Sequence, residues 1–331
     1  MNQPIRPRRN RKNSAIRSMI HETVLTPANL IYPLFIHEGA EDQPIDSMPG
    51  CMRWSLVGLI EEAKRAHQEG IPAIVLFPAI EEHLKSKGAS ECYNPDGLIP
   101  TAIRRLKESI PSLQVITDVA LDPYNSDGHD GLVEETSSGE IQIINDETVE
   151  ILCKQALCHA EAGADIVAPS DMMDGRVGAI RATLDQAGFS QVSIMSYTAK
   201  YASAYYGPFR GALDSAPKAG DKKTYQMEPS NTREALRELR LDEQEGADYI
   251  MVKPAGSYLD IIALLRNNTH LPIAAYQVSG EYLMIKSASK DGWLDEQKVM
   301  IESLIGIKRA GADTILTYFA LDYAIWYNRR A

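Results

Sequence analysis

The sequence has few cysteines, no long apolar run and no apolar signal at its start. Its 331 residues include four cysteines, none of them in a Cys-x-x-Cys pair, which excludes a small disulfide-stapled fold and a cysteine-rich zinc site. No stretch approaches the roughly 18 apolar residues of a membrane-spanning helix. The first twenty residues lack the apolar centre of a secretory signal. We therefore expect a cytoplasmic protein with no membrane partner.

Basic charge is scarce outside the N-terminus. The first twenty positions hold six basic residues and no acidic one, which leaves 28 basic and 45 acidic residues and a formal charge of −17 in the rest. So acidic a body repels nucleic acid, and we expect no nucleic acid partner. Residues 1–29 are interpreted as a basic arm that contacts a neighbouring, acidic subunit. A solvated tail, an RNA-binding tail and an organelle-targeting peptide are the alternatives.

Short apolar, β-branched segments alternate with helical patterns from residue 30 onward. Eight segments read as strands, at 30–36, 73–77, 115–119, 165–168, 192–197, 249–252, 272–276 and 314–318. Helical spacing of apolar residues occurs at 57–68, 146–162, 232–244 and 295–309. A glycine follows the helical pattern at positions 70, 163, 246 and 311, and an apolar segment follows each glycine. These turns fit left-handed helix caps that lead into strands.

This alternation predicts an α/β fold, a (β/α)8 TIM barrel that forms a single domain over residues 30–331. A doubly wound open sheet is the alternative. It is less favoured because no Gly-x-Gly-x-x-Gly follows an early strand. A phosphate-binding Gly-x-x-x-x-Gly-Lys-Ser/Thr loop is missing too, so no nucleotide cofactor is expected.

Two lysines follow consecutive strands of the predicted barrel. Lys253 comes directly after 249–252, and Lys200 holds the corresponding place after 192–197. Barrel enzymes carry their chemistry where strands end, and neighbouring strands lie about 4.8 Å apart. Two such amines lower each other's pKa, and a desolvated neutral amine attacks carbonyl carbon. A lysine that reaches solvent or pairs with a carboxylate is the structural alternative.

Two loops of the predicted barrel are rich in polar groups. The loop 118–131 contains Asp118, Asp122, Asp130 and His129, and it suits a hard cation, a substrate ammonium or an ordinary turn. The segment 201–227 is long for such a connection and is interpreted as an active-site lid. Its charges are expected either to clamp a carboxylate or to be solvated. As a mobile lid, it is expected to make few core contacts.

Several longer motifs carry a family resemblance. They are MVKPA at 251–255, KYAS at 200–203, YGPFR at 206–210, YQVSGEY at 276–282, APSDMMDGR at 168–176, YNPDG at 93–97 and YFA at 318–320. The sequence resembles the porphobilinogen synthase family, also called 5-aminolevulinate dehydratase, from about residue 22 to 323. Several long motifs in the same order make the resemblance specific.

The resemblance implies a lyase that condenses two 5-aminolevulinate molecules to porphobilinogen with loss of two waters, in tetrapyrrole synthesis. It implies Schiff bases at Lys253, for the substrate that supplies the propionate side, and at Lys200, for the substrate that supplies the acetate side. The substrate-binding residues that it implies or that the rim suggests are Arg210, Lys222, Gln226, Ser279, Tyr318, Asp118 and Ser170. A class I aldolase-type lyase, which needs one lysine, is the alternative.

The resemblance also implies the metal and the assembly. Zinc-dependent members have three cysteines where this chain has Ala120, Asp122 and Asp130, so no catalytic zinc is expected. Asp122 and Asp130 become candidate ligands of a harder cation. Glu238 matches a glutamate that binds allosteric Mg²⁺ at a subunit interface. The basic arm matches one that wraps a neighbouring subunit, which implies a homo-oligomer, an octamer.

Overall fold

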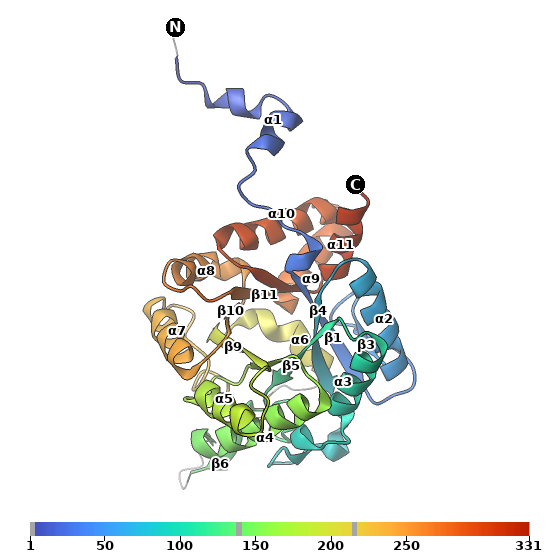
Figure 1. Cartoon of the computed structure of the whole chain (residues 1–331), viewed down its shortest axis with the longest axis vertical. Helices are drawn as coiled ribbons and strands as arrows, with labels where there is room; N and C mark the ends of the chain where they lie inside the picture. The colour runs from blue at the N-terminus through green and yellow to red at the C-terminus, as the bar shows by residue number, and fades with distance from the viewer. Residues whose placement is uncertain (1–3, 137–140, 214–216, 331) are drawn as a thin grey trace.

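A closed barrel of parallel strands forms the centre of the molecule (Figure 1). The computed structural model describes residues 4–136, 141–213 and 217–330. Within these residues the barrel strands are β1 (Leu30–His37), β4 (Ala73–Ala79), β5 (Gln114–Val119), β8 (Ile166–Pro169), β9 (Ser193–Lys200), β10 (Tyr249–Lys253), β11 (Ile273–Gln277) and β12 (Thr314–Thr317). Each pairs in parallel with the next, and β12 pairs with β1. All eight expected strands are present, and the (β/α)8 barrel is confirmed.

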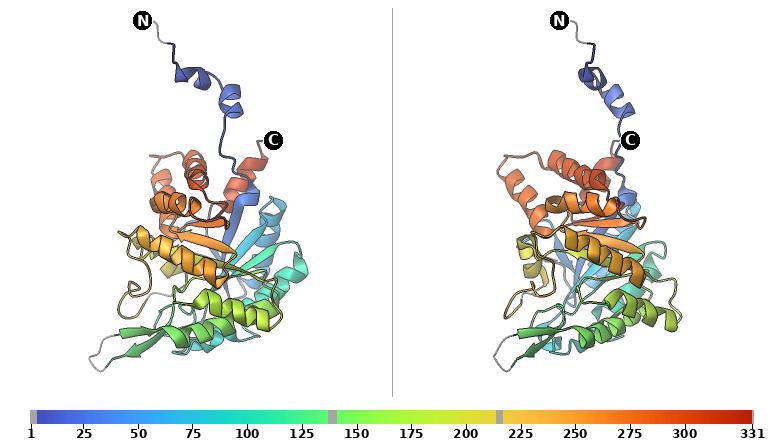
Figure 2. Two further views of the ribbon diagram at one scale, coloured as in Figure 1. Left: turned by 60° about the vertical axis from the view of Figure 1, so that its left-hand side comes forward. Right: turned by 90° about the vertical axis from the view of Figure 1, so that its left-hand side faces the viewer.

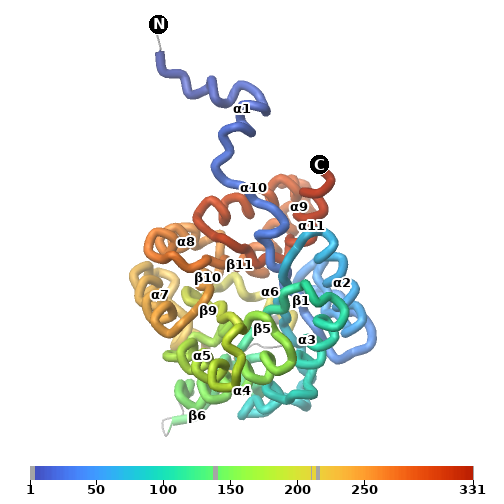
Figure 3. The backbone as a smooth tube through the Cα atoms, in the orientation of Figure 1, coloured from blue at the N-terminus to red at the C-terminus, as the bar shows by residue number. Residues whose placement is uncertain are grey.

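Helices surround the barrel, as the tube drawing shows (Figure 3). They are α2 (Leu56–Gln68), α3 (Leu98–Ser109), α4 (Asn145–Ala162), α5 (Arg176–Gln186), α7 (Arg233–Glu245), α8 (Leu259–Arg266), α9 (Ser279–Lys290), α10 (Glu296–Ala310) and α11 (Ala320–Asn328). No helix in the described ranges has the length and apolar character needed to cross a membrane.

The recurring Gly-Ala-Asp turns join these helices to the strands. Gly163 and Gly246 have φ of 104° and 96°, in the left-handed region that favours glycine. The aspartates have a role that the pattern did not predict, because each carboxylate accepts a hydrogen bond from the backbone N–H of the neighbouring strand. These bonds join Asp165 to Val115 (2.7 Å), Asp248 to Ile194 (2.7 Å) and Asp313 to Ile273 (2.8 Å). Each turn therefore ties the start of one strand to its neighbour.

Several short elements decorate the barrel. The hairpin of β6 (Leu132–Glu135) and β7 (Ile141–Ile144) lies between β5 and α4, and β2 (Gln43–Pro44) pairs with β3 (Met52–Trp54). Near the N-terminus, a 3-10 turn (Pro7–Arg11) and α1 (Ser14–Met19) bury no residue, and this segment projects away from the barrel (Figure 2). Other short 3-10 turns are Pro27–Asn29, Glu82–Leu84, Ser90–Tyr93, Ala204–Tyr206 and Gly256–Tyr258.

Aromatic rings fill the interior of the barrel beneath the segment 201–227, which the sequence predicts to be a lid. Phe35 lies against Tyr318 with ring centroids 5.8 Å apart, and Phe77 lies 6.2 Å from Tyr276. Phe209 of α6 (Gly207–Leu213) reaches this cluster, 5.2 Å from Phe77 and 5.5 Å from Phe35. The first half of the lid is therefore packed onto the barrel interior, and the expectation of few core contacts is wrong for this part.

Candidate active site

Two buried lysines stand side by side where β9 and β10 end. Lys200 and Lys253 are register partners in the parallel pairing of these strands, and their residues are only 5% and 7% exposed. In a parallel barrel the carboxyl ends of neighbouring strands share one rim, so this register turns two separate sequence positions into one site. The expected close approach of the two lysines is confirmed.

Aromatic rings enclose the amine of Lys253. Its Nζ lies 4.7 Å from the ring centroid of Tyr276, 5.1 Å from those of Tyr197 and Tyr206, and 5.2 Å from that of Phe209. Burial, together with the positive charge of Lys200, lowers the pKa of Lys253 to about 7. A large fraction of this amine is therefore neutral and nucleophilic at physiological pH.

Carboxylates oppose the two lysines across the site. Burial and the nearby charge of Asp122 raise the pKa of Asp118 to about 7, while Lys253 and Lys200 act in the opposite direction. Lys200 Nζ donates a hydrogen bond to the backbone carbonyl of Ser170 and lies 3.8 Å from Asp130 Oδ1. Asp118 and Lys253 can therefore both exchange protons near neutral pH, as acid–base groups beside a nucleophile do.

Lys222 reaches this site from the lid and meets the acidic loop. Its Nζ lies 3.2 Å from Asp122 Oδ2 and 3.0 Å from Asp130 Oδ2, and all three residues are buried. Burial alone would lower the pKa of Lys222, but the two carboxylates raise it above its usual value. Burial would likewise raise the pKa of Asp130, but Lys200 and Lys222 lower it. The described residues around Lys222 are thus also anchored, and the expectation that the predicted lid makes few core contacts is wrong here too.

The ammonium of Lys222 occupies the place in the acidic loop where a cation was expected. No group of three His, Cys, Asp or Glu side chains is arranged to hold a metal ion in residues 4–136, 141–213 and 217–330. Asp122 and Asp130 already share a positive partner, so their arrangement does not fit a divalent cation. The sequence analysis left a hard cation, a substrate ammonium and an ordinary turn open for this loop, and it did not foresee an ammonium group from the protein itself.

The remaining predicted residues differ in where they lie. Ser170 and Gln226 line the same cavity as the lysines, together with Asp118. Ser279 and Tyr318 lie next to it and are bonded within the protein: Ser279 Oγ accepts from the backbone N–H of Phe209 at 3.0 Å, and the Tyr318 hydroxyl lies 2.8 Å from that of Tyr276. Arg210 belongs to α6, and its side chain lies outside the described part of the chain.

A buried ionic cluster supports the strand that carries Lys200, and the sequence did not point to it. Arg176 donates to Ser196 Oγ of β9 at 3.1 Å, and Ser196 Oγ donates to Asp242 Oδ2 at 2.7 Å. Arg176 also lies 3.6 Å from Asp171 and 3.8 Å from Asp242. The only sequence signal was the position of Arg176 and Asp171 in the 168–176 motif, because ionic partners far apart in the chain have no local pattern.

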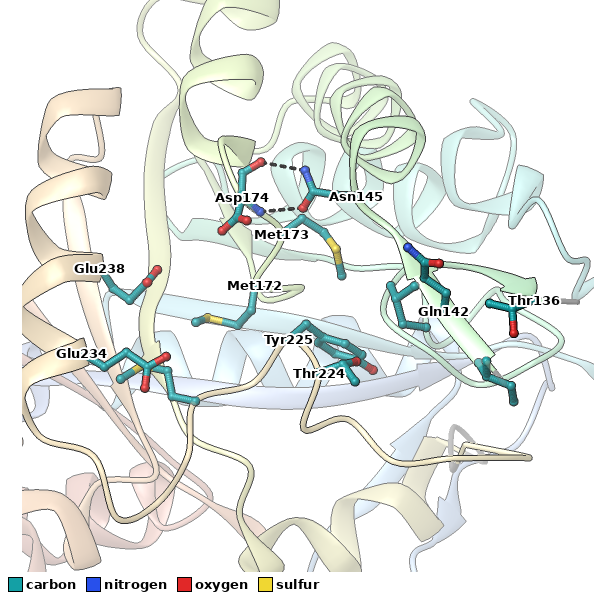
Figure 4. A pocket seen from close by; sticks show the side chains of 13 residues that line it. Thr136, Gln142, Asn145, Met172, Met173, Asp174, Thr224, Tyr225, Glu234 and Glu238 are labelled. Carbon is teal, nitrogen blue, oxygen red and sulfur yellow. Dashed lines mark hydrogen bonds between the residues drawn. The ribbon is translucent and has the colours of Figure 1, made fainter. Parts of the chain in front are cut away.

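Glu238 lies on α7 at the edge of a second cavity, of about 590 Å³, outside the lysine site (Figure 4). Glu234 and Asp174 line the same cavity, as does Tyr225 of the lid. Burial raises the pKa of Glu238 to about 7, although Arg176 lowers it. A half-buried carboxyl group of this kind gains from a cationic partner, because the charge of such a partner would offset the cost of burying an ionised carboxylate.

The family model for delta-aminolevulinic acid dehydratase matches residues 4–326. The chain belongs to this family. It is 62% identical over 325 residues to the chloroplastic delta-aminolevulinic acid dehydratase of Physcomitrium patens, with 98% of this chain and 74% of the relative covered. For the chloroplastic enzyme of Selaginella martensii the identity is 63% over 323 residues, with 97% and 76% covered.

A solved structure agrees with these relatives. The crystal structure of delta-aminolevulinic acid dehydratase from Toxoplasma gondii ME49, in complex with the reaction product porphobilinogen, has a TM-score of 0.96 and 53% identity. The alignment covers 98% of this chain and 92% of that one. This chain is accordingly a lyase that condenses 5-aminolevulinate to porphobilinogen in tetrapyrrole synthesis.

The comparisons correct the expected location. The relatives from Physcomitrium patens, Selaginella martensii and Glycine max are all named chloroplastic, at 62%, 63% and 63% identity. They point to a plastid, and the expectation of a cytoplasmic protein is wrong. The composition of the folded domain could not predict the location, because targeting signals are recognised by receptors and are independent of that composition.

Proposed function

We propose that Lys253 and Lys200 form the two Schiff bases of the condensation, Lys253 with the substrate that supplies the propionate side and Lys200 with the one that supplies the acetate side. The observation that carries this assignment is the register pairing of two buried lysines, one with its pKa lowered to about 7. Each amine, once it has lost its proton, attacks a substrate ketone, and the carbonyl oxygen leaves as water. The resulting iminium acidifies the C–H bonds of the adjacent carbon. That carbon can then lose a proton and attack the second substrate.

The polar groups around the lysines have separate roles in this proposal. Asp118 moves protons during imine formation, and Ser170 lies beside it in the cavity. Ser279 and Tyr318 bind the carboxylate of the first substrate. The lid residues Arg210, Lys222 and Gln226 bind the carboxylate of the second. For Lys222 this requires a change of partner, because its ammonium is paired with Asp122 and Asp130 in this structure.

The pH dependence of porphobilinogen formation tests the lysine assignment. As pH rises through about 7, Lys253 loses its proton and becomes a nucleophile, so kcat/KM should rise toward a plateau. Asp118 titrates in the same range, so the rise in kcat/KM reports the titration of Lys253 and Asp118 as a pair and not of Lys253 alone. Circular dichroism at each pH controls for unfolding. A kcat/KM that stays constant between about pH 5.5 and 8 in folded protein would argue against a Lys253 nucleophile.

We propose that residues 1–29 form an arm that contacts a neighbouring subunit of a homo-octamer, with residues 30–331 as the barrel domain and 201–227 as its lid. The apolar side chains of Ile5, Met19 and Ile20 are exposed, which supports a protein partner for the arm. The arm is basic and the rest of the chain is acidic, so the charges of arm and body are complementary.

The family is metal-dependent, and we propose that its metal here is Mg²⁺ bound near Glu238. Mg²⁺ is commonly held by one or two carboxylates and several waters, so it does not need three protein ligands. Glu238, Glu234 and Asp174 supply oxygen donors around a cavity with room for waters. Bound there, the ion would favour the assembled protein and take no part in bond formation at the lysines.

Chelation separates the two candidate metals. A zinc-selective chelator should leave the rate intact, whereas EDTA should lower it and added Mg²⁺ should restore it. Glu238→Ala should remove the response to Mg²⁺ and shift the sedimenting species to smaller assemblies, while the exposed Glu150 on α4 provides the control variant Glu150→Ala. Stoichiometric zinc lost together with activity would contradict the proposal of Mg²⁺. An unchanged Mg²⁺ response in Glu238→Ala would contradict the site.

A further inference from the structure

The lysine cavity is small in this structure. The space open to the centre of a water molecule is about 30 Å³, enough for one or two waters. Two 5-aminolevulinate molecules need several times this volume, so the lid must open to admit them and close again around them. The contacts that hold the lid shut therefore bear on catalysis.

One end of the lid is fixed to the barrel. The backbone N–H of Met227 donates to the carbonyl of Lys200 at 3.0 Å, and the N–H of Ala202 donates to the carbonyl of Met227 at 2.8 Å. At the other end, the backbone N–H of Lys218 donates to the carbonyl of Asp127 at 3.1 Å. The ion pair of Lys218 with Glu82 adds little there, because both side chains are more than 60% exposed. Closure of the segment 217–226 thus depends on buried contacts between these two points.

His129 of the acidic loop makes such a contact. It is 1% exposed, its Nε2 lies 2.9 Å from the carbonyl oxygen of Ala219, and its Nδ1 lies 3.1 Å from the hydroxyl of Tyr225. A carbonyl oxygen only accepts hydrogen bonds, so Nε2 carries the proton in the neutral ring. Nδ1 is then the acceptor, and the Tyr225 hydroxyl donates to it. One imidazole thus holds the lid at two positions six residues apart.

Tyr225 continues this chain of bonds toward the lysine site. Its hydroxyl oxygen accepts from the backbone N–H of Asp130 at 3.4 Å. Asp130 is the residue whose carboxylate pairs with Lys222 and faces Lys200. The Tyr225 ring also lies edge-on to His129, with 6.1 Å between the ring centroids. Tyr225 therefore contacts both His129 and the backbone of Asp130.

We propose that His129 and Tyr225 are positioning residues that latch the lid over the two lysines. They touch neither the reacting atoms nor the amines, and they act by holding the segment that carries Lys222 and Gln226 in place. The proposal rests on the proposed function only for its kinetic consequence. The latch itself is a property of the protein without substrate, so the two can fail separately.

Limited digestion with trypsin tests the latch directly. Trypsin cleaves after Lys218, Lys222 and Lys223, which all lie in the latched segment. Removing one hydrogen bond of the latch should raise the rate of cleavage there by about fivefold. Cleavage in the basic arm, for example after Arg8 or Arg11, provides an internal reference that should not change.

Three variants divide the latch into its parts. Tyr225→Phe removes the hydroxyl and keeps the ring, so it should fold normally. It therefore tests the latch even if His129→Ala does not fold. His129→Gln keeps an amide donor near Nε2 and should retain the Ala219 contact, so its lid should be cleaved more slowly than that of His129→Ala. The control is His83→Gln, a histidine whose side chain is 69% exposed outside the lid.

The kinetic result expected of a latch is specific. Tyr225→Phe and His129→Ala should raise KM for 5-aminolevulinate about fivefold and lower kcat by less, because the lysines remain in place once the lid is closed. In the double variant the two effects should not add, since both residues belong to one latch. Unchanged lid cleavage in folded Tyr225→Phe and His129→Ala would overturn the latch. Lid cleavage that rises while borohydride traps no substrate on Lys253 would leave the latch standing and refute the proposed function.

Discussion

Replacing Lys253 with alanine should lower kcat/KM for porphobilinogen formation by at least a thousandfold, or about 4 kcal/mol in activation free energy. The expected loss is large because, in the proposed mechanism, the amine forms a covalent bond that no neighbouring group can supply. Lys200 is the nearest candidate, but its amine is already directed at the Ser170 carbonyl and at Asp130. The four aromatic rings around Lys253 would instead enclose an empty, apolar space.

Borohydride reduction in the presence of 5-aminolevulinate provides the direct measurement. Peptide mapping should find the mass of the reduced substrate on Lys253 in the parent protein and in Lys200→Ala, but not in Lys253→Ala. Lys286→Ala is a matched control, because Lys286 also lies over two aromatic rings, at 5.5 and 5.6 Å, but pairs with Glu296 at 2.6 Å. An adduct on another lysine, with Lys253 unmodified, would show that the nucleophile is assigned wrongly.

The sequence predicts the barrel and the lysine pair because both depend on local patterns. Buried parallel strands read as short apolar runs, and the glycines at 163 and 246 mark helix ends whose left-handed backbone the structure confirms. Lys200 and Lys253 were placed together by one rule, that parallel strands end at a common rim. The structure agrees, because Lys200 and Lys253 are register partners at the ends of β9 and β10.

Contacts between distant segments were beyond the reach of these patterns. Lys222 meets Asp122 across 100 positions, and His129 meets Tyr225 across 96. Nothing near Lys222 in the sequence distinguishes a buried ion pair from a solvated lid charge, which is why few core contacts were expected. The same holds for Arg176 and Asp242, whose pairing depends on how α5 and α7 pack beside β9. In these cases the fold decides what a charged residue does.

Lys222→Ala separates the two views of the lid. A solvated or loosely held lysine would raise KM when removed and leave stability unchanged. A buried lysine between two carboxylates predicts a loss of about 3 kcal/mol in the free energy of unfolding at neutral pH, because Asp122 and Asp130 would lose their shared positive partner. Chemical denaturation of the variant and the parent measures this difference. Lys222→Arg, which keeps the charge, should retain most of the stability.

The pH dependence of that loss identifies its cause. Burial already raises the pKa of Asp122 in the folded protein, and without Lys222 the repulsion from Asp130 would raise it further. A carboxyl group with a raised folded pKa binds its proton more tightly when folded, so its contribution to stability is present at low pH and is lost as pH rises through that pKa. The deficit of Lys222→Ala relative to the parent should therefore shrink as pH falls from about 7 toward 5. Lys223→Ala is the control, because the side chain of Lys223 is 66% exposed and its Nζ lies 4.0 Å from Asp221. Equal stability of Lys222→Ala and Lys223→Ala at neutral pH would show that the ion pairs of Lys222 do not hold the lid.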